Sequence, residues 1–155
     1  MKKITLMVAI LATTLLQSIS AQDKTTTGSN TLNGYYAVKD ALVSGNANLA
    51  NSKAIEFVET LTTDSTLPEL NRIALIKEAS SIANTKDIKK QRTYFSALSQ
   101  SIFAVAKVQK LSSQPIYKAY CPMVKASWLS NSSSIKNPCY GSAMLTCGNV
   151  VEILK

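Results

Sequence analysis

The sequence contains no histidine. Histidine is the most common ligand of catalytic zinc and a frequent ligand of Cu(II), and it is the usual base beside a nucleophilic serine or cysteine. Its absence argues against Cu(II) binding, against His-based zinc catalysis and against Ser–His or Cys–His nucleophiles.

Aspartate and glutamate are absent from residues 88–151. Hard ions need oxygen ligands, and glycoside hydrolysis needs paired carboxylates, so this part of the chain has the residues for neither. A CxxC pair is also absent, which argues against a thiol-redox enzyme. We therefore expect no enzymatic activity.

The apolar run near the N-terminus, residues 4–16, is too short to be a comfortable membrane span, which takes about 20 residues. It follows Lys2 and Lys3 and precedes small residues that end at Ala21. This pattern predicts a secretory signal peptide over residues 1–21, an exported protein whose most favoured location is the periplasm, and no membrane-spanning segment after cleavage. An uncleaved N-terminal anchor is the alternative. Residues 22–30 are predicted to be a flexible lead-in.

Positive charge exceeds negative charge along the chain. The formal net charge is +8, and cleavage after Ala21 removes Lys2 and Lys3 to leave +6. The only basic cluster, within residues 86–92, is typical of a solvated helix face rather than of a nucleic-acid footprint. We expect acidic partners or a membrane surface, and no nucleic acid.

Residues 31–155 are predicted to form a single domain, because hydrophobic residues recur at helical spacing in four segments with short polar connections. The segments begin near residue 31 and extend to 43, then run from 47 to 62, from 68 to 84 and from 86 to 111. We expect an all-α fold, an antiparallel four-helix bundle. In the third segment, Leu70 and Ile73 are expected to lie on the buried face.

The segment 115–149 differs from the predicted helices, because all three cysteines of the chain lie in it: Cys121, Cys139 and Cys147. Met123 lies two residues after Cys121, and Met144 lies three residues before Cys147. We expect this tail to be irregular, with short β-strands possible around residues 116–120 and 150–154.

Two hypotheses account for the sulfur atoms. Thiolates and thioethers select Cu(I) and other soft ions, so Cys121, Met123, Met144 and Cys147 would make a sulfur-only metal site. Alternatively, exported thiols oxidise, and a Cys121–Cys147 disulfide would fasten the tail to the helices and contribute about 3 kcal/mol. The methionines would then fill gaps in the core. The residues alone leave both hypotheses open, and either way three cysteines cannot all pair within one chain.

The tail resembles the DUF3347 family of exported domains of unknown function, common in Bacteroidetes and also fused to periplasmic adaptor subunits of copper/silver efflux pumps. The helical segments match loosely, at Tyr36, residues 40–42, Arg92, Phe95 and Ser99. The tail carries the match at Tyr117, residues 121–123, residues 128–130, Ile135, Asn137, Pro138, Tyr140, Gly141, Met144, Leu145, Cys147 and Gly148.

The resemblance implies a helical bundle with a Cys/Met tail near metal efflux. It implies Cys121, Met123, Met144 and Cys147 as ligands. The residues implied to shape the site are Trp128, Asn137, Pro138, Tyr140 and Gly141. The chain departs from the family at Cys139, where an aromatic residue is expected, and at Val124, where a small residue is expected. A thiol at position 139 either joins the site or disturbs it by pairing wrongly.

The sequence and the resemblance together predict an exported domain that binds Cu(I) or another soft metal ion. It would buffer the ion or hand it to an efflux adaptor or another envelope protein. The alternative is a protein-interaction module without metal, whose tail is held by a Cys121–Cys147 disulfide.

Overall fold

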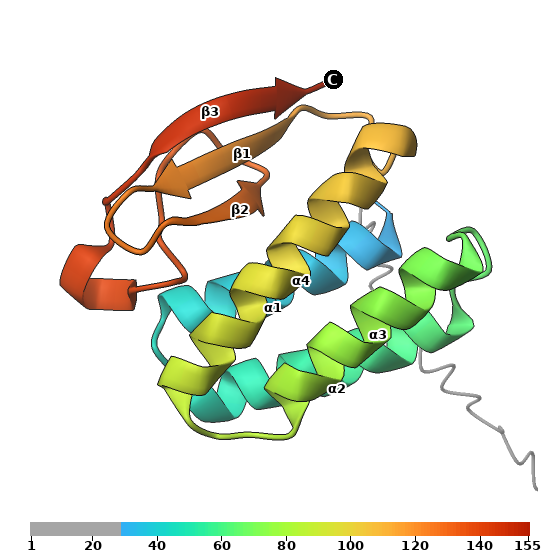
Figure 1. The fold of residues 1–155 in the computed structure, drawn as a ribbon, viewed down its shortest axis with the longest axis horizontal. Coiled ribbons are helices and arrows are strands. Elements are labelled where there is room, and N and C mark those ends of the chain that lie inside the picture. The colour runs from blue at the N-terminus through green and yellow to red at the C-terminus, as the bar shows by residue number, and fades with distance from the viewer. Residues whose placement is uncertain (1–28) are drawn as a thin grey trace, which may run out of the picture.

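The computed structural model describes residues 29–155. The predicted signal peptide and residues 22–28 of the lead-in lie outside the described residues. Four helices come first, α1 (Asn30–Val43), α2 (Ala47–Thr63), α3 (Glu69–Ala83) and α4 (Ile88–Val108). The tail then forms β1 (Ile116–Cys121), β2 (Ala126–Ser130), a short 3-10 helix η1 (Gly141–Met144) and β3 (Asn149–Leu154), as Figure 1 shows.

The predicted helical bundle is confirmed, with each helix packed against the next in the chain. The all-α prediction is wrong, because the tail builds a three-stranded antiparallel sheet in the order β2-β1-β3. Strands near residues 116–120 and 150–154 are present, and β2 was not expected. Ser127 and Ser130 interrupt the apolar character of β2, and the pairing of Trp128 with Ala119 compensates for its short length.

Polar side chains fix where the helices begin. The Ser29 Oγ accepts a hydrogen bond from the Leu32 N–H at 3.2 Å, so α1 begins one residue before its predicted start. Asp87 caps α4 by accepting from the Lys89 N–H at 2.9 Å, so this helix begins two residues after its predicted start. Such caps satisfy N–H groups that have no partner within the helix.

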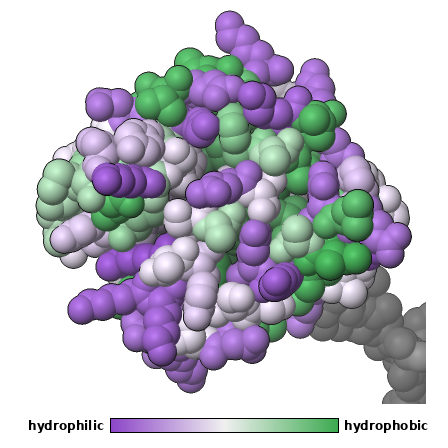
Figure 2. Space-filling view, viewed as in Figure 1, coloured by the Kyte–Doolittle hydropathy of each residue, from purple (hydrophilic) through white to green (hydrophobic). Residues whose placement is uncertain are grey.

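The third helix is rotated relative to our expectation. Its buried residues are Leu75, Ala79 and Ile82, whereas Leu70 is 82% exposed and Ile73 is 53% exposed. At 3.6 residues per turn, Ile73 and Leu75 lie on nearly opposite sides of a helix. Figure 2 accordingly shows hydrophobic surface on the side of the molecule where α3 lies.

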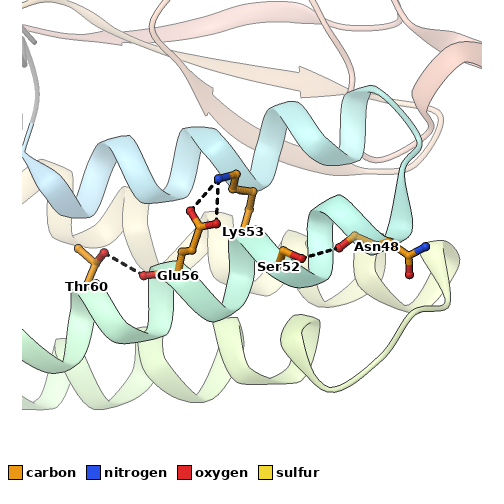
Figure 3. Close-up of polar contacts among 5 residues, drawn as sticks. All are labelled: Asn48, Ser52, Lys53, Glu56 and Thr60. Carbon is orange, nitrogen blue, oxygen red and sulfur yellow. Dashed lines mark hydrogen bonds and ion pairs between the residues drawn. The ribbon is translucent and has the colours of Figure 1, made fainter. Parts of the chain in front are cut away.

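Polar side chains on the exposed surface of α2 make contacts within the helix. The Lys53 Nζ lies 2.7 Å from a Glu56 carboxylate oxygen one turn along the helix. The Ser52 and Thr60 hydroxyls each donate to the carbonyl four residues earlier, those of Asn48 and Glu56 (Figure 3). Exposed pairs of this kind add only a few tenths of a kcal/mol, so α2 depends on its buried face.

Tyr35 joins the helices to the sheet. Its ring stacks on Phe95 of α4 with centroids 5.1 Å apart. Its hydroxyl shares a 2.8 Å hydrogen bond with the Ser99 side chain and accepts a 3.0 Å bond from the backbone N–H of Leu129 in β2. Burial raises the pKa of Tyr35 above its ordinary range, so the hydroxyl stays neutral. This one side chain sets the position of β2 on α4.

We predict that Tyr35→Phe lowers the free energy of unfolding by about 1–3 kcal/mol, because it leaves the buried Leu129 N–H without an acceptor. Tyr36→Phe is the matched control. The Tyr36 hydroxyl is buried and has no hydrogen-bond partner within residues 29–155, so its removal is expected to be neutral or stabilising. Urea unfolding of both variants checks this, and equal losses would contradict the assigned role of Tyr35.

Candidate functional site

The structure brings two of the three cysteines together. Cys121 is the last residue of β1 and is fully buried, and Cys147 lies just before β3 and is half-buried. Their Sγ atoms are 2.7 Å apart. The proximity follows from the sheet, because β3 pairs antiparallel with β1 and places Asn149 opposite Tyr120.

The chain reverses direction immediately after Cys121. Residues 122–125 form the turn between β1 and β2, in which Lys125 adopts a φ of 50°. The backbone N–H groups of Met123 and Val124 then donate to the Cys121 sulfur. Pro122 has no N–H group, and it keeps the preceding cysteine in an extended conformation. The turn therefore provides two fixed donors to a buried sulfur.

These donors favour the thiolate form of Cys121. Burial acts to raise the pKa of this thiol, but hydrogen bonds from Cys147, Val124, Met123 and the Asn137 side chain outweigh it, so the pKa lies below the ordinary value. A hydrogen bond to the charged form of an acid stabilises that form.

The pKa of Cys147 shifts in the opposite direction, above its ordinary value. Its hydrogen bond to Cys121 is the main cause that raises its pKa, and burial and the negative charge of Cys121 add to the effect. The Met123 N–H opposes the shift. Cys121 is thus the first of the two to lose its proton, and Cys147 keeps its proton to higher pH.

Asn137 organises the loop that delivers Cys147. It is fully buried, and its side-chain Nδ2 donates to the Cys147 carbonyl at 3.1 Å. Its Oδ1 accepts from the Cys139 N–H at 2.8 Å, and its backbone N–H donates to the Leu145 carbonyl at 2.8 Å. Pro138 is buried beside it.

Trp128 and Gly148 pack against each other next to Cys147. Trp128 is 1% exposed, and a Cβ at position 148 would lie 3.0 Å from its ring and 2.9 Å from the Tyr120 carbonyl oxygen. Gly148 has a φ of 135°, which side chains rarely permit, so glycine is required there. Tyr140 is 41% exposed, and Gly141, with a φ of 65°, packs against the Arg92 guanidinium.

The two methionines contact the pair through their backbones. The Met123 N–H faces both sulfurs, and the Met144 carbonyl accepts from the Cys147 N–H at 3.1 Å. The Met123 side chain is 66% exposed, and Met144 is half-buried. The predicted thioether ligands are therefore near the pair in the chain, with one of them open to solvent.

Cys139 does not join the pair in a cluster. Within residues 29–155 there is no group of three or more His, Cys, Asp or Glu residues placed to hold a metal ion. Burial and the negative charge of Cys121 together raise the pKa of Cys139 to about 12, and the Arg92 charge opposes the shift. Cys139 is half-buried, and its thiol is neutral at neutral pH. It is not a member of the Cys121–Cys147 pair, although the charge of Cys121 affects its pKa.

Sequence reasoning missed part of the polar environment of the pair. The Val124 and Met123 N–H groups and the Asn137 amide all donate to the Cys121 sulfur. No sequence pattern shows which N–H groups the turn after Cys121 directs at the sulfur. The resemblance implied Asn137 only as a residue that shapes the site.

We predict two separate thiol titrations for the pair in a reduced Cys139→Ser protein, followed by thiolate absorbance at 240 nm. The first step, from Cys121, is expected below the ordinary thiol pKa of about 8.5, and the second, from Cys147, above it. In a Cys121→Ser, Cys139→Ser protein, the remaining step moves down toward 8.5, because the hydrogen bond to the Cys121 sulfur and its negative charge are both gone. Two overlapping steps near 8.5 would contradict the assigned hydrogen bonds.

The comparison with known proteins matches the helical part of the chain but not the tail. Within the described part of the chain, no helix combines the length and apolar character needed to cross a membrane. No curated protein and no solved structure matches the chain. One family model does match, over residues 31–114, which includes all four helices and ends before β1. The cysteine pair lies outside the matched range, but the match covers more than half of the sequence: the chain belongs to the family of proteins of unknown function DUF3347.

Proposed function

We propose that the chain is an exported domain that binds Cu(I) or another soft metal ion through its tail. The observation that carries the proposal is the convergence of Cys121 and Cys147, whose sulfurs lie 2.7 Å apart. Thiolates favour soft ions, and residues 115–151 offer no imidazole or carboxylate to attract harder ones. The domain would buffer the ion or pass it to a partner in heavy-metal efflux, such as an efflux adaptor.

The residues present fit a soft ion. The Cys121 thiolate is stabilised by N–H donors before any ion arrives, which lowers the cost of the deprotonation that binding requires. Metal–thiolate bonds are about 2.3 Å long, so the two sulfurs must separate to admit an ion. Cys121 is fixed in β1, whereas Cys147 is half-buried in a loop, so Cys147 is the residue placed to move.

Met123 and Met144 complete the proposed ligand set. Met123 is the ligand suited to transfer, because its side chain is 66% exposed and rotates without disturbing the core. A partner with its own sulfur ligands can replace an exposed thioether before it displaces the thiolates. The Asn137 amide holds the Cys147 carbonyl and donates to Cys121, and so acts as a positioning residue for both.

We predict one-to-one Cu(I) binding by the reduced protein in an anaerobic titration against a competing chelator. Binding is expected to be lost in Cys121→Ser/Cys147→Ser and retained in Cys139→Ser, the matched control that removes the third thiol. Asn137→Ser is expected to weaken binding by about 10–100-fold, as is usual when a residue that orients ligands is removed. Equal binding by the double variant and the parent protein would end the proposal.

The alternative function is an envelope interaction module without metal, and the same short sulfur distance favours it. Two adjacent thiols in an oxidising compartment can form a disulfide, which would lock the tail in place. Alkylation of protein taken directly from the cell envelope separates the two functions. Cys121 and Cys147 blocked to the reagent, with Cys139 still reactive after unfolding, would support the alternative over metal binding.

A further inference from the structure

A large cavity lies between α4 and the tail, away from the helical core. Its volume is about 770 Å³, within the range of about 300–1,000 Å³ typical of small-molecule sites. α4 contributes Lys89, Arg92, Thr93 and Ser96 to one wall, and the tail contributes Ala126 and Ala143 to the other. In Figure 1 α4 runs beside β2, which carries part of the wall opposite the helix.

The charged side chains that line this cavity are all positive. Among the described residues that line it, Lys89 and Arg92 carry charge and none is acidic. A smaller cavity of about 140 Å³ follows along the same helix and is lined by Lys118 and Lys125, with Gln100 shared by both. Lys118 is paired with the Glu152 carboxylate at 3.8 Å, whereas neither Lys89 nor Arg92 forms an ion pair within residues 29–155. The groove is suited to an anion.

Arg92 lines the cavity from a fixed position. Its Nη2 donates to the Leu42 carbonyl at 3.2 Å, which anchors the guanidinium to the end of α1. Its Nε is buried and has no hydrogen-bond partner within residues 29–155, so it is closed to the solvent and to a molecule in the open cavity. The contribution of Arg92 to the cavity is therefore the positive charge of its guanidinium.

The remaining lining is suited to a hydrocarbon body. Ala97 of α4 faces the cavity together with Val124, Ala126 and Ala143 of the tail. Cys139 also lines it, and with a pKa of about 12 its thiol adds no negative charge at neutral pH. A cation pair next to small apolar side chains recognises a molecule with an acidic group and an aliphatic body.

We propose that this cavity binds a small organic anion, a carboxylate with an aliphatic body. The carboxylate lies between the Lys89 ammonium and the Arg92 guanidinium, while the body lies against the alanines and Val124. The site does not use the Cys121–Cys147 pair. The proposal of an anion site is therefore independent of the proposal of metal binding.

The probe for the test is octanoate, titrated into isotopically labelled, reduced protein while backbone amide signals are followed. Saturable shifts are expected for α4 residues 89–100 and for residues 124–126 and 139–143. Octanamide, which keeps the body and lacks the charge, is expected to bind about tenfold more weakly, the cost of one charge-assisted hydrogen bond. Shifts that do not saturate, or that lie elsewhere, would overturn the proposal.

Variants separate a specific site from general attraction to a basic protein. Lys89→Gln is expected to weaken octanoate binding about tenfold. Lys86→Gln removes the same charge from an exposed lysine outside the cavity and is expected to leave binding unchanged. Ala97→Leu keeps every charge but places a bulkier side chain against the proposed position of the hydrocarbon body, and it is expected to weaken binding about tenfold. Equal affinities for the two lysine variants would show non-specific attraction and refute the site.

A last comparison distinguishes failure of this proposal from failure of the metal proposal. Ala97→Leu is expected to bind Cu(I) as the parent protein does, and Cys121→Ser/Cys147→Ser is expected to bind octanoate as the parent protein does. Loss of octanoate binding in the double cysteine variant, with the fold unchanged by circular dichroism, would contradict an independent site.

Discussion

The antiparallel pairing of β1 with β3 is the constraint on which the site depends. β1 is the central strand, and it ends at Cys121 beside the start of β3. The segment between β2 and β3 must therefore return along the sheet, and Asn137 holds it there through bonds to the Cys147 carbonyl, the Cys139 N–H and the Leu145 carbonyl. The meeting of the two thiols is a consequence of strand order rather than of any direct attraction between them.

The helices serve this arrangement by providing a rigid surface for the sheet. Tyr35 reaches from α1 past Phe95 to the backbone of β2, so three elements far apart in the chain meet at one hydroxyl. The Lys118 ammonium lies 3.8 Å from the centre of the Phe103 ring, which ties β1 to α4 as well. Cation–π contacts of this kind are worth about 0.5–1 kcal/mol at exposed sites. The sheet thus has a fixed position, and its loops enclose the cavity beside α4.

The sequence was informative where one physical signal dominates. Hydrophobic spacing located all four helices, and in α4 the spaced apolar residues Phe95, Leu98 and Ile102 are buried. It failed in α3, where Leu70 and Ile73 are as apolar as the buried Leu75 and Ile82, so hydrophobicity alone could not choose the face. It also failed for β2, a five-residue strand whose existence depends on pairing with β1. The cysteines were expected to matter, but the backbone donors around Cys121 and the cavity lined by Arg92 depend on long-range packing that no local pattern records.

The turn after Cys121 couples protonation to folding. Lys125 adopts a φ of 50°, a left-handed conformation that costs a residue other than glycine about 1–2 kcal/mol. Hydrogen bonds from the same turn to the Cys121 sulfur offset this cost most fully when the sulfur is ionised. Because the folded pKa lies below that of the unfolded chain, this stabilisation is fully present above the unfolded value of about 8.5 and is lost as the pH falls through the folded value. By the same linkage, any reaction that removes the Cys121 thiolate changes the stability of the hairpin. The chemical state of this sulfur atom and the conformation of the backbone around it are therefore thermodynamically coupled.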